Sequence, residues 1–443
     1  MGAPSVLLIA EAANPEWVSV PLVGWCLARA IAKFTRAHLV THVRNREAIL
    51  HNLGSRGFSP GSLTFIDSEK VDQWAGRVGS VLRGGAGKGW TTVTALKALS
   101  YYYFEDLVWR LFEPRIRAGE FDLVHRLTPL SPTIPSLMAR RSEKAGVPFV
   151  LGPLNGGLRW PAGFDSIRRK EKEWLSYLRF AHKLLPGYRS TRDAASAILL
   201  GSAAAWREVP VRYHEKCFYL PENGFDPERF QSQRTHQASR PLRAIFVGRL
   251  VPYKGLDLLL EAAAPLVRAE ELSIEIVGEG PERDELEGWV RNHRMQGGVS
   301  FSGWVDHSQL SLHLSQADLF VFPSLREFGG GAIIEAMAAG LVPLTVDYGG
   351  PGELVTPETG FLIPMQRREG LVQGLRNILL EIVKDPSLLE AKSPLAQRRA
   401  HEHFTWEVKA ERIVEIYRWV LEGRTEKGPQ AEIPEMEAIG WMR

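Results

Sequence analysis

The sequence predicts an α/β protein built from two parallel-sheet domains. Its 443 residues are more than a single compact hydrophobic core usually serves. Short apolar strands alternate with helix-length segments in both halves, a pattern typical of parallel sheets with helical crossovers. The two runs are separated at 231–241 by a polar stretch, QSQRTHQASRP, without apolar periodicity. We therefore expect a first domain over 1–230, a linker over 231–241 and a second domain over 242–395.

Each half contributes its own strands. In the first half we expect strands at 5–10, 37–43, 63–66, 123–124, 147–151, 197–200 and 216–220, with helices at 21–34, 91–113 and 165–185. In the second half we expect strands at 243–247, 273–277, 299–302, 319–323 and 342–346, with helices at 256–269, 282–293, 309–314, 331–339, 367–383 and 396–420. The last residues, 423–443, form a polar tail.

Composition excludes several classes of protein. The apolar fraction of 44% and the charged fraction of 24% argue against wholesale disorder. Two cysteines, Cys26 and Cys217, are too few for a disulfide scaffold or a cysteine-rich zinc module, and they suit a reducing compartment. The apolar run at 6–10 is stopped by Glu11, so it indicates a strand and not a signal peptide or anchor. We therefore expect a cytoplasmic location.

Charge divides unevenly between the halves. Residues 1–240 carry 33 Lys and Arg against 21 Asp and Glu, whereas residues 241–443 carry 21 against 30. Halves of opposite sign indicate domains with different partners. The basic excess is densest at 140–192, where twelve Lys and Arg stand against four acids. There, apolar residues alternate with the basic ones (Ile167, Trp174, Leu175, Leu178 and Leu185). A solvated helix over the first sheet and a helix that attaches to an anionic membrane both fit this pattern.

Two glycine-rich stretches imitate nucleotide-binding motifs. The stretch 84–92 has Gly89 where a phosphate loop needs Ser or Thr, and Leu82 where it needs glycine. The loop at Gly278 begins like a dinucleotide fingerprint but has Arg283 at the third glycine position, although it could still face a nucleotide. The twelve histidines show no metal-ligand spacing. We therefore expect no metal and no bound cofactor.

Two strand ends in the second half carry charged side chains beside glycines. The strand at 243–247 runs into Gly248 and Arg249, and Lys254 precedes the next helix. Free N–H groups at a helix start attract anions, and two cations there suit a pyrophosphate. A basic loop with solvated side chains is the alternative. The strand at 319–323 leads to Glu327, and Glu335 follows in the next helix. Carboxylates so placed can accept hydrogen bonds from the vicinal hydroxyls of a ribose or a hexose.

These motifs resemble a known family. Gly248-Arg-Leu with Lys254-Gly, Glu327-x7-Glu335 and Gly349-Gly-x-x-Glu353 are similar to motifs of the retaining, nucleotide-sugar-dependent glycosyltransferases of family 4. The resemblance is specific over 216–420 and rests on the order of elements over 1–215. It implies the GT-B fold, with two Rossmann-like domains facing a central cleft. It also implies that a C-terminal helix, 396–422, crosses back onto the first domain.

The resemblance also implies roles for individual residues. Arg249 and Lys254 would bind the donor diphosphate, and Glu335 would bind the ribose hydroxyls. Glu327 would hold the transferred sugar together with the loop glycines. The full donor-side set is Gly248, Arg249, Lys254, Gly278, Glu327, Phe328, Gly329, Gly330, Gly331 and Glu335.

In the first domain, the resemblance places a histidine, His125, at a strand end facing the cleft. Its alternative is a strand-end histidine satisfied by hydrogen bonds within the fold. Asn155, Gly156 and Gly157 would line the acceptor or donor side of the cleft. The family often has a glycine pair after its first strand, whereas this chain has Ala-Ala-Asn-Pro at 12–15. That departure weakens any assignment of acceptor contacts near 11–24.

The expected function is transfer of a sugar from a nucleotide-diphosphate sugar, as substrate, to a glycan, lipid-linked or small-molecule acceptor. The resemblance implies retention of anomeric configuration, with Arg249, Lys254, Glu327 and His125 as catalytic residues and without a metal. No nucleic-acid partner is expected. Attachment at the inner membrane face remains open. A non-catalytic sugar-nucleotide-binding protein on the same fold and a sugar-nucleotide epimerase are the alternatives; the epimerase would change the donor without any acceptor.

Overall fold

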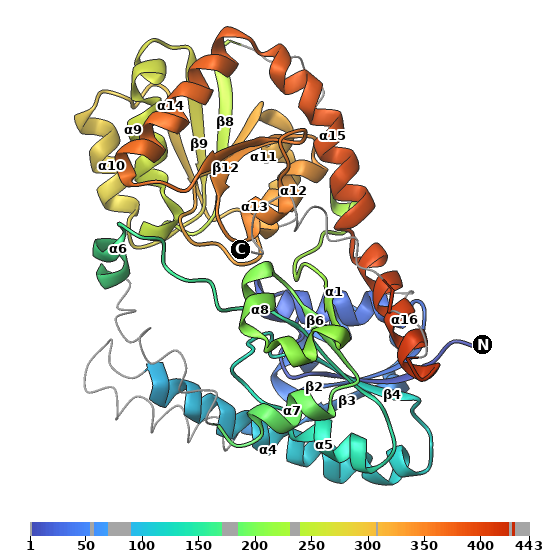
Figure 1. Ribbon diagram of the computed structural model, residues 1–443. Coiled ribbons are helices and arrows are strands. Elements are labelled where there is room, and N and C mark those ends of the chain that lie inside the picture. The colour runs from blue at the N-terminus through green and yellow to red at the C-terminus, as the bar shows by residue number, and fades with distance from the viewer. Residues whose placement is uncertain are drawn as a thin grey trace. The chain divides into compact units, whose positions relative to one another are not determined.

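The computed structural model describes residues 2–53, 57–69, 90–170, 185–230, 240–306, 309–424 and 428–429, with only the backbone for 90–99. The chain divides into two compact units. The first contains Met1–Gly157, Glu173–Glu222 and Trp406–Arg443, and the second contains Leu158–Lys172 and Asn223–Thr405. Two parallel-strand Rossmann-like sheets, one in each unit, confirm the predicted α/β fold class (Figure 1).

The first unit contains a seven-stranded parallel sheet in the order β3-β2-β1-β4-β5-β6-β7. Its strands are β1 (Ser5–Ala10), β2 (Arg36–His42), β3 (Leu63–Ile66), β4 (Leu123–Thr128), β5 (Phe149–Leu154), β6 (Ala197–Leu200) and β7 (Cys217–Tyr219). Side chains alternate across the sheet. Val6 and Leu8 of β1 join the core that includes residues of α1 and α16, whereas Leu7 and Ile9 join the core that includes residues of α4.

Helices supply the rest of these two cores. The helices of the first unit are α1 (Val20–Ala32), α2 (Arg46–His51), α4 (Trp90–Arg117), α5 (Leu137–Lys144), α7 (Tyr188–Ala194), α8 (Ala203–Glu208) and α16 (Trp406–Leu421). Trp25 of α1 and Tyr417 of α16 are both buried in the same cluster. Their helices have the amphipathic spacing that buries one apolar face. The last long helix of the chain therefore completes the first unit.

The second unit contains a six-stranded parallel sheet in the order β10-β9-β8-β11-β12-β13. Its strands are β8 (Leu242–Val247), β9 (Leu272–Val277), β10 (Val299–Gly303), β11 (Leu319–Phe322), β12 (Val342–Asp347) and β13 (Phe361–Pro364). Its helices are α6 (Asp165–Lys170), α9 (Leu256–Arg268), α10 (Arg283–Asn292), α11 (Leu310–Gln316), α12 (Gly331–Ala338), α13 (Gly350–Leu354), α14 (Arg368–Lys384) and α15 (Ser387–His403).

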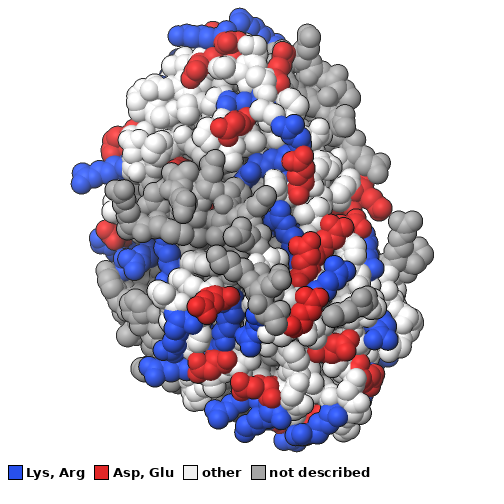
Figure 2. Space-filling model, turned by 45° about the vertical axis from the view of Figure 1, so that its right-hand side comes forward, with Lys and Arg blue, Asp and Glu red and all other residues white. Residues whose placement is uncertain are grey.

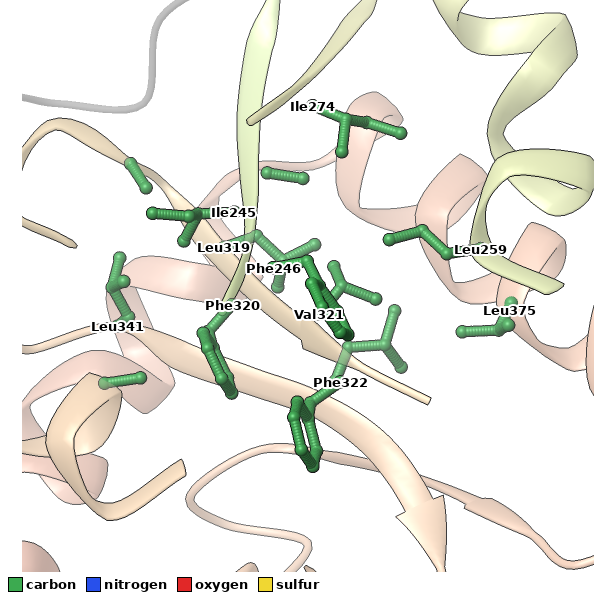
Figure 3. Packing of buried hydrophobic residues seen from close by; sticks show 14 of the residues in the cluster. Ile245, Phe246, Leu259, Ile274, Leu319, Phe320, Val321, Phe322, Leu341 and Leu375 are labelled. Carbon is green, nitrogen blue, oxygen red and sulfur yellow. The ribbon is translucent and has the colours of Figure 1, made fainter. Parts of the chain in front are cut away.

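Aromatic residues of adjacent strands pack together in this sheet. The rings of Phe246 and Phe322 lie 5.7 Å apart at 17°, and those of Phe320 and Phe322 lie 5.8 Å apart (Figure 3). Leu259 of α9 and Leu375 of α14 belong to the same cluster. Its apolar strands, buried among helical side chains, give near-continuous hydrophobic runs in the sequence, and this is why the sequence predicted five of them. The short β13 was missed.

The units differ in two places from the domains expected from the sequence. Segment 158–172 belongs with the second unit, and the chain enters that unit again after Glu222 and not at 231–241. The reason is packing: Phe225 and Phe230 are buried in the second unit's core. Of the expected linker, 231–239 lies outside the described residues.

The predicted C-terminal helix is two helices, because the chain leaves helical geometry at Phe404 and Thr405. The Phe225 N–H donates to the Phe404 carbonyl at 3.1 Å, and Phe225 forms an isolated parallel bridge with Thr405. The predicted helix at 165–185 begins as α6 at Asp165, but its continuation over 171–184 lies outside the described residues, as do 84–89 and most of the tail.

Surface charge and hydropathy bear on the membrane question. Among the described residues, no helix is both long and apolar enough to cross a bilayer. On the face shown in Figure 2, basic and acidic side chains are interspersed. In the basic segment, Ile167 packs against the second unit's core and Arg168 pairs with Asp165 at 3.5 Å. Trp174, Leu175 and Leu178 lie outside the described residues, so membrane attachment stays a prediction.

Candidate functional site

The candidate site lies where the strand order of the second sheet reverses. Strand β8 has β9 on one side and β11 on the other, so the chain winds outward in two directions from the β8–β11 pair. In open α/β sheets, ligands bind outside the carboxyl ends of the strands at this switch point. The loops that follow β8, β11 and β12 therefore share one edge, and they carry most of the predicted donor residues.

The first of these loops supplies an exposed cation. Arg249 follows β8 directly, its side chain is exposed, and it has no ion-pair partner among the described residues. The neighbouring Gly248 donates its N–H to the Val277 carbonyl at 3.0 Å, which fixes the backbone. Gly278 lies close to the backbone of Gly248, because a Cβ at position 278 would lie 2.0 Å from the Gly248 carbonyl oxygen. Glycine at 278 thus lets the turn carrying Arg249 pack against the loop after β9.

Lys254 and Glu327, 73 residues apart, form an ion pair that joins the loops after β8 and β11. Their side chains are only 13% and 18% exposed. The ammonium of Lys254 also lies 4.6 Å from the centroid of the Phe322 ring. The second carboxylate oxygen of Glu327 accepts the Gly330 N–H at 3.3 Å. The two side chains that the resemblance gave separate partners are thus in direct contact.

Two helices begin at this edge after glycine residues, which have no side chain to cap the first backbone N–H groups. Helix α9 begins after Gly255 and α12 begins after Gly330, and neither N-cap residue makes a side-chain cap bond. First-turn N–H groups and the helix dipole both favour an anion at such a position. Glu335 lies on α12, half-buried, one turn beyond its start. Gly329 precedes the N-cap residue Gly330, and Gly331 is the first residue of the helix. Their role in holding the transferred sugar stays a prediction.

The loop after β12 holds the Glu327 loop from the other side. The Gly350 N–H donates to the Glu327 carbonyl at 3.0 Å. Gly349 has a φ of 67°, and a Cβ there would lie 2.5 Å from that same carbonyl oxygen. Only glycine combines this backbone conformation with so close an approach. The Phe328 carbonyl packs against Gly350 in the same way, since a Cβ there would lie 2.6 Å from it.

His125 in the first unit differs from the sequence-based expectation. The strand continues to Thr128, so His125 lies inside β4 and not at its end. It is completely buried; its Nδ1 lies 2.5 Å from the Tyr417 hydroxyl, and its Nε2 donates to the Gly152 carbonyl at 2.7 Å. Burial lowers the pKa of His125 from 6.5 to about 3. This geometry corresponds to the alternative of a satisfied histidine, and we assign His125 no catalytic role.

The buried imidazole predicts a specific pH dependence. In the unfolded chain His125 takes up a proton below pH 6.5, whereas in the folded chain its pKa is about 3. The unfolded state therefore binds more protons in this interval, and the free energy of unfolding falls as the pH drops from about 6.5 toward 3. At pH 7 the free energy of unfolding of His125→Gln should be about 1–3 kcal/mol lower than that of wild type. Between pH 7 and pH 4.5, however, the free energy of unfolding of the variant should fall less than that of wild type. Denaturant unfolding at both pH values measures these free energies, and His51→Gln, at an exposed histidine, is the control. If acidification lowers the free energy of unfolding equally in wild type and His125→Gln, the prediction is wrong.

Asn155, at the carboxyl end of β5, is held in place by its own loop. Its Oδ1 accepts hydrogen bonds from the Ser202 hydroxyl at 2.7 Å and from the Gly156 N–H at 2.8 Å. Its Nδ2 is buried and has no hydrogen-bond partner among the described residues. Gly156 and Gly157 follow and end this part of the first unit. A role for these three residues in the cleft stays a prediction.

Sequence reasoning missed Arg326 and Trp160, which lie around the ion pair together with the predicted Phe328. Arg326 and Phe328 flank Glu327, and the Arg326 guanidinium lies 4.9 Å from the centroid of the Phe328 ring. Trp160 lies 5.1 Å from the same guanidinium. Its only sequence signal was the strand-end glycine loop shortly before it, at 156–157. Among the described residues, no group of three or more His, Cys, Asp and Glu could hold a metal ion.

Two Rossmann-like units, with a charged switch-point edge in the second, define the architecture of GT-B glycosyltransferases. The solved structure of Anabaena HepE in complex with UDP has this fold: its TM-score is 0.60 at 18% identity, covering 93% of this chain and 98% of that one. Residues 228–392 match the family described as "Glycosyl transferases group 1". That match includes every predicted donor-side residue.

Curated relatives extend the match beyond the second unit. The chain is 30% identical over 297 residues to the GDP-mannose-dependent monoacylated alpha-(1-6)-phosphatidylinositol monomannoside mannosyltransferase of Corynebacterium glutamicum, covering 63% of this chain and 73% of the relative. It is also 30% identical over 217 residues to a glycogen synthase of Mycobacterium tuberculosis, covering 48% of this chain and 51% of that protein. The chain thus spans about half of that relative's length. The chain belongs to the group 1 glycosyltransferases.

Proposed function

We propose that the protein transfers a sugar from a nucleoside-diphosphate sugar to an acceptor hydroxyl, with retention and without a metal, as a family 4 enzyme. The observation that carries this proposal is the Lys254–Glu327 pair beside exposed Arg249 at the switch point of the second sheet. The names of two related proteins agree with such a donor, since one is GDP-mannose-dependent and the other was solved with UDP.

The proposed chemistry needs charge stabilisation more than proton transfer. The bond between the anomeric carbon and the diphosphate breaks, and the leaving group gains negative charge. Arg249 and the N–H groups at the starts of α9 and α12 would stabilise that charge. The sugar passes through an oxocarbenium-like state. The acceptor oxygen then bonds the anomeric carbon on the face the diphosphate leaves, and its proton passes to a phosphate oxygen.

Nucleotide binding and product analysis test this function. Titration calorimetry with UDP and GDP identifies the nucleotide, and sugars on that nucleotide are then assayed with acceptor mixtures. We expect turnover with retained anomeric configuration by NMR, unaffected by EDTA. Inhibition by EDTA that added magnesium reverses would contradict metal independence. Binding without turnover would indicate a non-catalytic protein, and a changed donor without acceptor would indicate an epimerase.

Glu335 should serve donor affinity more than the chemical step. Its proposed partner is the ribose, whose bonding changes little during transfer, so its loss removes binding common to ground state and transition state. Glu335→Gln should raise the donor Michaelis constant about tenfold, with turnover at saturation changed less than threefold. Steady-state kinetics with varied donor measures both constants. An unchanged Michaelis constant with a collapsed turnover would contradict the ribose assignment.

For the acceptor, we propose a membrane-proximal or lipid-linked substrate, with basic side chains of the segment 140–192 as the attachment element. Buried Arg192 and the buried strand β5 would take no part. Each basic side chain near an anionic surface contributes about 1 kcal/mol, and this contribution is screened by salt. In a flotation assay, the protein should therefore bind anionic vesicles at low salt and dissociate from them at high salt. It should not bind neutral vesicles. No association with anionic vesicles at low salt would favour a soluble glycan or small-molecule acceptor.

A further inference from the structure

A segment encoded between strands of the first unit packs entirely with the second. Leu158–Lys170, which we call the strap, follows β5 and includes α6. Phe164 is 3% exposed within the second unit's core, and Ile167 packs against that core. Figure 1 shows α6, in teal, beside the yellow elements of the second unit. The strap is therefore anchored in the sheet that carries the donor loops.

The strap binds Arg326, the residue directly before Glu327. The Leu158 carbonyl accepts hydrogen bonds from Nε and Nη2 of Arg326, both at 3.3 Å. The Trp160 ring lies 5.1 Å from the Arg326 guanidinium, which also contacts the Phe328 ring at 4.9 Å. A guanidinium over aromatic faces is attracted by their quadrupoles. The side chain of Arg326 thus joins the Glu327 loop to the strap and also contacts Phe328 on the other side of Glu327.

The same strap contacts the loops that hold the other components of the site. Trp160 packs edge-on against Tyr253, the neighbour of Lys254, with centroids 6.4 Å apart and an interplanar angle of 87°. The Tyr348 hydroxyl donates to the Arg159 carbonyl at 2.9 Å. The Leu158 side chain lies against Gly349, where a Cβ would be 2.7 Å from its Cδ2. The strap therefore touches the loops after β8, β11 and β12.

We propose that the strap is part of the donor site, and that Trp160 and Leu158 are positioning residues for the Lys254–Glu327 pair. This inference rests on the proposed function and adds residues to it. Trp160 contacts the sequence neighbour of each member of the pair, Tyr253 and Arg326, so it fixes the two loops relative to each other. Charges aimed at a transition state are effective only when held in place beforehand. Donor turnover thus depends on a segment outside the sequence of the donor sheet.

Replacement of Trp160 tests the inference in the full chain. Trp160→Ala should lower kcat/KM for the donor about tenfold to a hundredfold, since small misplacements of reacting groups have effects of this size. Trp160→Phe should restore most of the loss. Trp289→Ala, at a half-buried tryptophan of α10 that packs against the same core but lies outside the strap, is the matched control. It should lower the melting temperature at least as much as Trp160→Ala and leave kcat/KM within about twofold.

A double-mutant cycle then asks whether Trp160 acts through Arg326. Arg326→Lys keeps the charge but loses the paired bonds to the Leu158 carbonyl. If both residues fix one loop, kcat/KM of the double variant should be little lower than that of the less active single variant. The two losses of kcat/KM should therefore not multiply. If Trp160→Ala fails to fold, Trp160→Leu takes its place in the cycle, because it removes the aromatic ring but keeps an apolar side chain.

The outcomes separate the inference from the function on which it rests. If wild-type protein binds neither UDP nor GDP and turns over no nucleotide sugar, the proposed function fails. If wild type is active and Trp160→Ala stays within twofold of it, the strap has no positioning role and the function stands. Effects of Trp160 and Arg326 that multiply fully, or a loss of kcat/KM by Trp289→Ala equal to that by Trp160→Ala, would also overturn the inference.

Discussion

Replacing Arg249 with alanine should lower turnover by about a hundredfold or more while the protein stays folded. Arg249 is exposed directly after β8 and has no ion-pair partner among the described residues, so its removal breaks no ion pair with them. The proposed transition state places new negative charge on the diphosphate, and losing one preorganised donor to such charge typically reduces kcat a hundredfold to a thousandfold, about 3–4 kcal/mol. Kinetics at saturating donor and the melting temperature are the two measurements.

Matched variants separate charge from geometry at this position. Arg249→Lys keeps the positive charge without the planar fork and should recover part of the activity. Arg268→Ala, an exposed arginine at the end of α9, should leave both turnover and stability unchanged. Equal activity of Arg249→Ala and Arg268→Ala would show that Arg249 is only a solvated loop residue, the alternative left open by the sequence.

The sheets and the glycine loops could be predicted because their causes are local. Most strands of the second unit are short and rich in apolar residues, and helices with apolar faces follow them. Arg249 and Lys254 stand next to a strand end and a helix start, so their common edge follows from the alternation alone. The one strand missed there, β13, has four residues and ends in Pro364, which leaves little pattern to detect.

What could not be predicted depends on contacts between distant residues. Nothing near His125 in the sequence shows that Tyr417, 292 positions later, will occupy its Nδ1. The strap was assigned to the first domain by continuity, whereas burial of Phe164 places it with the second. Likewise, Glu327 and Lys254 were each matched to a ligand group, and their mutual pairing needed the fold. Tertiary packing decided each of these cases.

Glu327→Gln should have an effect as large as that of Arg249→Ala, for a different reason. One carboxylate oxygen of Glu327 pairs with Lys254 and the other accepts the Gly330 N–H at 3.3 Å. Glutamine has nearly the same shape, so the Gly330 bond can remain while the charge on the lysine's partner disappears. Lys254 then loses the anchor that fixes its ammonium, and the transferred sugar loses a charged acceptor for its hydroxyls. We expect turnover to fall about a hundredfold to a thousandfold.

The lysine variant shows whether the pair acts as one unit. Lys254→Met keeps the apolar stem against Phe322 but leaves Glu327 without its cation, so turnover should fall by a similar factor. Stability should also fall, by about 1–3 kcal/mol. If the pair is one functional group, Lys254→Met combined with Glu327→Gln should be no slower than the slower single variant and should regain stability, because neither partner is left charged and half-buried. Turnover losses that multiply would instead mean that Lys254 and Glu327 act on the donor independently.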